Sequence, residues 1–182
     1  MAHLPSFRLL YEKVEAENEI HQIKLPVPAK SLEPVFSEDA THLHYGVLYK
    51  NYVKKALAGE GSFQVAGAKL HTLLFEQYQA PKASNIPTDA SKLLIDGKFG
   101  SFQKFKDSFT ESALTIHGSG WVYLDTNGKI KTIPNHKVLN DVAVIVDMWE
   151  HSYLIDYGSD KEKYLKEIWK VINWNIVNAR LN

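Results

Sequence analysis

The first strong pattern in the chain is a run of apolar and aromatic residues at mixed three- and four-residue spacings after Ser37. These residues are Leu43, Val47, Leu48, Tyr52, Val53 and Leu57. The spacing predicts a helix over residues 38–58, with Ser37 as its N-cap and Gly59 as its stop. A second helix is predicted over residues 63–79. Because only a short turn containing glycine separates them, the two should form an antiparallel hairpin.

A change of composition follows the second helix. The stretch QAPKASNIPTDA, residues 79–90, contains two prolines, one serine and an asparagine. Such residues favour turns and irregular backbone, so this stretch predicts a linker between two lobes.

The pattern of the second half is mixed. DASKLLIDGKF and SFQKFKDSFTESALTI predict two helices, the second capped by Ser101, and DKEKYLKEIWKVINWNIVNARL is helix-like after Gly158. Between them, two short β-rich runs flank residues 125–128, where Asn-Gly supplies the positive φ values of a tight turn, and DVAVIVDMW predicts a buried strand. The fold class is therefore α+β: a helical hairpin lobe, then a mixed α/β lobe with a small three-stranded antiparallel sheet.

Composition excludes several classes of function. The 182 residues contain 21 Lys and Arg against 21 Asp and Glu, so no overall field draws the chain to nucleic acid or to an anionic membrane. No window reaches the roughly 18 apolar residues of a membrane span. The chain has no cysteine, which is compatible with a cytoplasmic location, and any metal must sit on histidine and carboxylate.

The candidate chemistry begins at DMWEHSYLIDY, where Asp147 precedes His151 by four residues. That spacing suits an ordinary pair on one helix face as well as half of a metal site. His44 and His71 lie among apolar residues in the two hairpin helices, where an unpaired imidazole is costly. A lone helix histidine is more often structural than a ligand, so the residues alone leave both interpretations open.

Several segments, in order, resemble the iron/manganese superoxide dismutase family from about Leu25 to the C-terminus. They are LPVPAKSLEPVFS, HYGVLYKNYV, AGAKLHTLLF, FGSFQKFKDSF, GSGWVYL, DMWEHSYLIDY and YLKEIWKVINW. The D-x-W-E-H block with its distal Asn-Trp is the most specific of these.

The resemblance implies a mononuclear site with one Mn or Fe ion per subunit, bound by His44, His71, Asp147 and His151. Three neutral imidazoles and one carboxylate leave a fifth position for water or hydroxide. The family disproportionates superoxide to dioxygen and hydrogen peroxide while the metal cycles between M(III) and M(II). Superoxide is therefore the expected substrate.

The resemblance also implies residues that deliver protons. Tyr52 occupies the family's gateway-tyrosine position, about two helical turns after His44, so both can face one cavity. Where the iron-type pattern has glutamine, this chain has Gly67, which is the pattern seen when the partner of the metal-bound solvent comes from the second lobe. His136, in TIPNHKV, stands at that place.

Three further residues are expected around the substrate path. Trp121 and Trp149 should form an aromatic wall that excludes water. Lys161 falls where many family members have an arginine lining the channel, and it keeps the positive charge that would steer superoxide.

The expected assembly is a homodimer or a higher homo-oligomer. In the family, the glutamate of the W-E-H block pairs with the ligand histidine of the other subunit, and Glu150 preserves that possibility. A second, polar cross-subunit pair is replaced by Leu48 and Leu154, which suggests a repacked contact.

The linker and the resemblance together set the expected domain bounds. Residues 1–22 extend beyond the start of the family, so we expect an N-terminal extension over 1–22, a helical hairpin domain over 23–84 and an α/β domain over 85–182. The hairpin should be trimmed at its tip, because only 27 positions separate His44 from His71.

Two other functions compete with an active dismutase. One is a catalytically vestigial protein of the same fold with a binding or structural role. The other is an O₂-activating non-haem iron enzyme, which usually uses two histidines and one carboxylate, and which the third histidine disfavours. The choice between iron and manganese stays open.

Overall fold

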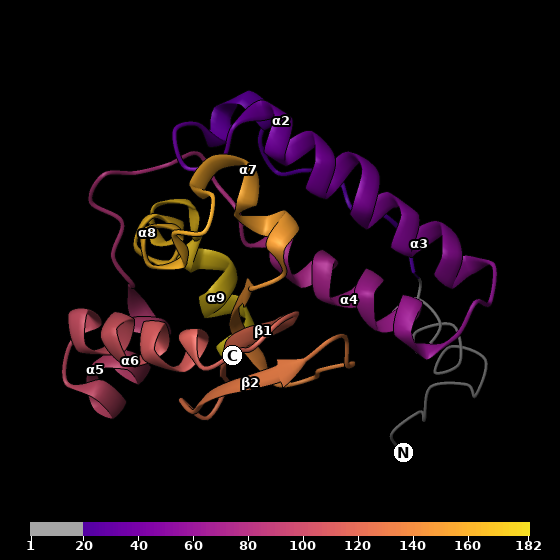
Figure 1. Cartoon of the computed structure of the whole chain (residues 1–182). Coiled ribbons are helices and arrows are strands. Elements are labelled where there is room, and N and C mark those ends of the chain that lie inside the picture. Colours follow the sequence, from indigo (N-terminus) through magenta and orange to yellow (C-terminus); the bar gives the residue numbers. More distant parts are fainter. Residues whose placement is uncertain (1–19) are drawn as a thin grey trace, which may run out of the picture.

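The computed structural model describes residues 20–182, and Figure 1 shows a helical hairpin lying over a layer of strands and helices. After a short 3₁₀ turn η1 (Ala29–Leu32), the first arm runs through α2 (Glu38–Thr41), η2 (His42–Tyr49) and α3 (Lys50–Leu57), and α4 (Ser62–Glu76) returns beside it. The predicted hairpin is therefore present.

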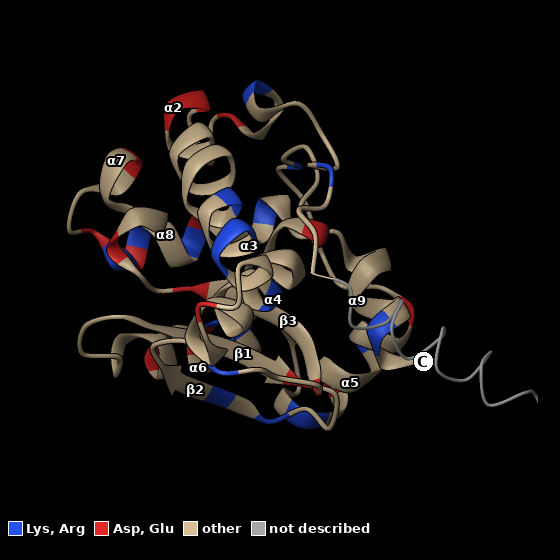
Figure 2. Ribbon diagram, turned by 90° about the vertical axis from the view of Figure 1, so that its right-hand side faces the viewer, with Lys and Arg blue, Asp and Glu red and all other residues tan. Residues whose placement is uncertain are grey.

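The first arm begins and ends where the sequence predicts. The Ser37 side chain accepts a hydrogen bond from the backbone N–H of Ala40, and Gly59 has a φ of 75°. Figure 2 shows acidic residues at the start of α2, and basic residues occupy the last turn of α3. These charges complement the helix dipole.

The interior of this arm departs from a regular α-helix. Residues 42–49 are π-helical, which rotates the helix face relative to an α-helix. The buried positions His44, Tyr49 and Val53 are accordingly five and four residues apart. As a result Val47, which the periodic pattern placed on the apolar stripe, is 39% exposed.

The second lobe contains α5 (Asp89–Phe99), α6 (Phe102–Leu114) and three strands, β1 (Gly120–Asp125), β2 (Ile130–Pro134) and β3 (Val142–Asp147). The sheet order is β2-β1-β3, and both pairings are antiparallel. The central β1 and its neighbour β3 are buried throughout, whereas β2 forms a partly exposed edge. The predicted α+β fold with a three-stranded antiparallel sheet is confirmed.

Two local expectations need correction, the first at the β1–β2 turn. Of its Asn-Gly pair only Gly128 has a positive φ, 79°. The Asp125 carbonyl accepts from Gly128 N–H, and the Asp125 side chain accepts from the Asn127 and Lys129 N–H groups. The aspartate holds the turn, so one left-handed residue suffices.

The second correction concerns the helix-like C-terminal segment, which is not one helix. It divides into α8 (Lys161–Glu167), the 3₁₀ segment η4 (Ile168–Val171) and α9 (Trp174–Leu181). The Asn173 side chain caps α9 by accepting from Asn175 N–H, while Asn173 N–H donates to the Gln77 carbonyl over 2.7 Å. Tertiary bonding to Gln77, the C-cap residue of α4, therefore outweighs the continuous helical pattern.

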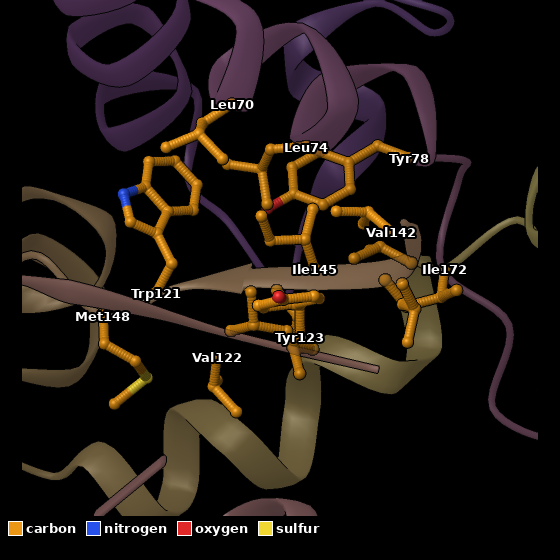
Figure 3. Close-up of a cluster of buried hydrophobic side chains, with 14 of the residues drawn as sticks. Leu70, Leu74, Tyr78, Trp121, Val122, Tyr123, Val142, Ile145, Met148 and Ile172 are labelled. Atoms are coloured by element: carbon orange, nitrogen blue, oxygen red, sulfur yellow. The ribbon is translucent and has the colours of Figure 1, made fainter. Parts of the chain in front are cut away.

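Helix α4 is attached to the sheet by polar as well as apolar contacts. The Gln77 side chain donates to the Ile145 carbonyl of β3 and accepts from the Ile145 N–H. Figure 3 shows Leu70 and Leu74 of α4 on the same side of the sheet as Trp121, with Val122 on the other side. These contacts fix the position of α4 relative to the end of β3.

The segment after α4 lies against the second lobe. Gln79 N–H donates to the Val171 carbonyl, and the Asn85 amide donates to the Trp169 and Ile172 carbonyls. The domain bounds 1–22, 23–84 and 85–182 stay predictions, and the extension falls almost wholly outside the described residues. Within residues 20–182, no helix is both long and apolar enough to cross a bilayer.

Candidate metal centre

Four side chains from four separate elements meet between the hairpin and the sheet. His44 comes from η2, His71 from α4, Asp147 from the end of β3, and His151 from the 3₁₀ turn η3 (Glu150–Ser152). One ligand atom of each lies within 4.8 Å of those of the others. The four groups could hold one metal ion.

The Asp147 carboxylate is central to this cluster. Its Oδ2 lies 3.3 Å from Nε2 of His44, 3.8 Å from Nε2 of His71 and 3.2 Å from Nε2 of His151. Its Oδ1 accepts from Trp149 N–H over 2.8 Å, which orients the group. Asp147 ends a strand and His151 lies in a 3₁₀ turn, so the pair four residues apart does not share a helix face.

Burial sets the protonation of the cluster. It lowers the pKa of His44 and takes the pKa of His71 well below its ordinary value. Burial alone would raise the pKa of Asp147, but His151 and His44 outweigh it and hold that pKa well below its usual range. Near neutral pH His44 and His71 are therefore neutral imidazoles beside the ionised carboxylate of Asp147, which are the forms that bind metal.

The buried histidine nitrogens also fit a cation. Within the described residues, Nε2 of His44 and Nε2 of His71 have no hydrogen-bond partner, although both face the cluster. Unpaired buried polar atoms cost free energy, and a bound metal would satisfy both lone pairs. A donor set of imidazole and carboxylate suits Mn and Fe.

His71 is held by contacts on its far side. Its Nδ1 lies 2.7 Å from the Gly67 carbonyl, which accepts its hydrogen and leaves the Nε2 lone pair facing the cluster. The Tyr49 ring stacks on the imidazole at 5.8 Å with an interplanar angle of 10°. The Tyr49 hydroxyl is in turn bonded to Thr72 Oγ1 at 2.7 Å. Sequence reasoning missed this supporting contact.

His136 and Tyr52 lie together next to the cluster. Their ring centroids are 4.7 Å apart, and they lie 5.9 Å and 5.1 Å respectively from the His71 ring. A Cβ at Gly67 would come within 2.7 Å of both His136 Nδ1 and Tyr52 Cδ1. Because Gly67 has no side chain, it leaves the space that His136 and Tyr52 occupy.

Aromatic rings enclose the same space. Trp121 is fully buried with its ring 5.1 Å from that of His71, and Trp149 lies 4.8 Å from His136. Phe63 stacks on His136 at 4.5 Å while its side chain stays 41% exposed, so it forms the outer side of this group of aromatic rings. Sequence reasoning missed Phe63, because one aromatic at the start of a helix gives no signal of that contact.

Lys161 is placed differently from Tyr52 and His136. Its Nζ lies 5.6 Å above the ring of Tyr153, which packs against Tyr164. The structure describes no contact between Lys161 and the other two residues within positions 20–182. Lys161 could therefore act on an anion only through its positive charge at the first residue of α8 (Lys161–Glu167).

The expected interface residues are at the surface of the single chain. Glu150 is exposed, Leu154 is 52% exposed and its neighbour Ile155 is 50% exposed, while Leu48 is half-buried. Exposed apolar side chains beside a site are compatible with a subunit contact.

Comparison with known proteins now defines the class. The model of the family "Iron/manganese superoxide dismutases, C-terminal domain" matches residues 87–180. A Porphyromonas gingivalis protein named superoxide dismutase [Mn/Fe] is 35% identical over 87% of this chain and 97% of its own length. The chain belongs to the iron/manganese superoxide dismutases.

Other relatives differ in the metal that their names give. Superoxide dismutase [Fe] of Bacteroides fragilis is 32% identical over 87% of this chain and 97% of its own length. The mitochondrial superoxide dismutase [Mn] of Aspergillus fumigatus is 33% identical over 82% of this chain and 86% of its own length. Similar levels of identity to both kinds do not separate iron from manganese.

Proposed function

We propose that this protein is an active superoxide dismutase, with His44, His71, Asp147 and His151 binding one Mn or Fe ion. The observation that supports this most strongly is the convergence of the four side chains within 4.8 Å in a chain that belongs to the family. When bound, the metal ion supplies the electron transfer by alternating between its M(III) and M(II) states. Two superoxide ions and two protons then yield one dioxygen and one hydrogen peroxide.

The residues of the chain supply and restrict protons. Burial and the Asp147 charge raise the pKa of Tyr52, so its hydroxyl keeps its proton near neutral pH and can donate it towards the site. Burial lowers the pKa of His136, which keeps that imidazole neutral beside Tyr52. In this proposal Tyr52 and His136 form the proton path.

The aromatic wall has a separate role. Trp121 and Trp149 exclude bulk water from the ligand cluster, which strengthens its electrostatic interactions and limits the mobile protons to those near Tyr52 and His136. The charge of Lys161 contributes only to the attraction of superoxide towards this side of the molecule.

The proposed assembly is a homodimer with a cytoplasmic location. Glu150 is exposed and directly precedes the ligand His151, and Leu154 and Ile155 add exposed apolar surface beside it. Leu48 completes the apolar contact. The absence of cysteine is compatible with the proposed compartment.

Metal analysis and a superoxide assay test the activity. Purified protein should contain about one Mn or Fe per chain and consume superoxide in the presence of cyanide. Stoichiometric metal without activity would refute the dismutase and favour the vestigial alternative. Expression with each metal separately would show which one supports turnover.

A pair of variants tests the ligand assignment. His71→Ala should lose the metal, whereas His117→Ala, which removes an exposed histidine outside the cluster, should retain it. Retention of metal at wild-type occupancy in His71→Ala would show that the ligand set is wrong.

A further inference from the structure

A second group of buried polar atoms lies behind the ligand His44. Thr41 and Ser152 are each only 4% exposed, and within residues 20–182 their hydroxyl oxygens have no hydrogen-bond partner. Thr41 lies three residues before His44 in the first hairpin arm, and Ser152 directly follows His151 in η3. Both hydroxyls therefore belong to segments that carry a proposed metal ligand.

Thr41, Ser152 and His44 line one small cavity. The remaining lining residues are all buried, and apart from the hydroxyl of Tyr78 their side chains are apolar: Leu32, Phe36, Ala40, Phe75 and Tyr78. The cavity offers about 10 Å³ to the centre of a water-sized sphere. That is the space of roughly one water molecule, and apolar cavities without polar groups stay dry.

His44 lacks the support that His71 has. The Nε2 atom of His44 faces Asp147, so a neutral imidazole that binds metal there carries its hydrogen on Nδ1. For His71 the Gly67 carbonyl accepts that hydrogen, but among the described residues no hydrogen bond involves Nδ1 of His44. Ligand histidines almost always donate their second N–H to an acceptor.

We propose that one water molecule binds in this cavity between the hydroxyls of Thr41 and Ser152 and accepts the Nδ1 hydrogen of His44. A water with three partners satisfies both hydroxyls and orients the imidazole. Thr41 and Ser152 are then positioning residues that act on the metal through His44. The consequence for the metal rests on the proposed function, because it requires His44 to be a ligand.

The first test separates hydroxyl chemistry from packing. Thr41→Val keeps the shape and removes the hydroxyl, whereas Thr41→Ser keeps the hydroxyl and removes the methyl group. In holoprotein transferred to excess chelator, Thr41→Val/Ser152→Ala should release metal about 10- to 100-fold faster than wild type, and Thr41→Ser should stay near wild type. Thr132→Val, an exposed threonine on β2, is the matched control and should change nothing.

The outcomes of this test are distinct. Wild-type metal release from the double variant would overturn the positioning role, and so would equal acceleration by Thr41→Ser, which indicates packing. The electron paramagnetic resonance spectrum of the bound metal should change in Thr41→Val but not in Thr132→Val, because a reoriented imidazole alters the ligand field.

A high-resolution crystal structure of the wild-type holoprotein tests the water even where the double variant fails to fold. Ordered water within hydrogen-bond distance of both hydroxyls and Nδ1 of His44 is expected, and a dry cavity refutes the proposal. The variant His44→Ala distinguishes failure of the water proposal from failure of the proposed function. If it keeps its metal, the ligand assignment is wrong; if it loses metal while the wild-type cavity is dry, only the water proposal fails.

Discussion

Gly67→Ala is the most informative single change, because it adds one methyl group next to the ligand cluster. Gly67 lies inside helix α4, and its carbonyl accepts the hydrogen of His71. A Cβ there would lie 2.7 Å from His136 Nδ1 and 2.7 Å from Tyr52 Cδ1, well inside van der Waals contact. Both rings must move for the alanine to fit.

The change in the free energy of unfolding of Gly67→Ala follows from two opposed effects. Alanine is more favourable than glycine inside a helix by about 1 kcal/mol. Overpacking a buried site typically costs about 1–3 kcal/mol, and here the two rings are in contact with each other at 4.7 Å. We expect a net loss of about 0–2 kcal/mol in the free energy of unfolding, together with a loss of superoxide turnover, because Tyr52 and His136 leave their positions.

Gly97→Ala is the matched control. Gly97 lies in helix α5, and a Cβ there meets nothing within 4 Å, so only the helix-propensity gain applies. It should raise the melting temperature by about 2–4 °C and keep full activity. Thermal unfolding and a cyanide-resistant superoxide assay on both variants make the comparison. Equal stabilisation and full activity in both would refute the described packing around Gly67.

Four further predictions concern the proposed metal ligands, the contact between Phe63 and His136, and the surface. Asp147→Asn should lower metal content by more than about tenfold, because it removes the only carboxylate of the cluster; elemental analysis measures this, and full occupancy would contradict the assignment. Metal-free protein should lose stability as the pH falls below about 6.5. His44 and His71 have lowered pKa values when folded, so the unfolded chain binds more protons there; urea unfolding near pH 7.5 and near pH 5.5 should show the decrease, and an increase on acidification would refute it. Phe63→Ala should keep the metal but raise the pKa of His136, because burial lowers that pKa and Phe63 covers the ring. NMR titration measures it, and an unchanged pKa would show that Phe63 does not bury His136. Leu154→Lys should leave the subunit folded but shift sedimentation towards the monomer at micromolar concentration, and an unchanged dimer would place the interface elsewhere.

Local signals in the sequence predicted the elements with strong caps and consistent periodicity. Ser37 and Ser101 cap the helices that they were expected to cap, because a side-chain oxygen next to a periodic segment satisfies N–H groups that any helix start exposes. The family and its four candidate ligands were also identified from sequence, because their residue types and order are linear properties of the chain.

The tertiary structure decided what depends on distant partners. The C-terminal helix breaks at Asn173 because the Gln77 carbonyl accepts its N–H, a bond between residues about a hundred positions apart. The π-helical turn around His44 is also invisible to a pattern that assumes one period.

The surroundings of the site likewise exist only in the folded chain. Phe63 stacks on His136 although the two are 73 positions apart in the sequence. Thr41 and Ser152 line the same cavity although they are 111 positions apart. The sequence by itself determined which side chains are available to bind a metal, because their chemistry is intrinsic. Only the packing of η2, α4, β3 and η3 decided how they are oriented and what supports them, because orientation and burial are properties of several segments together.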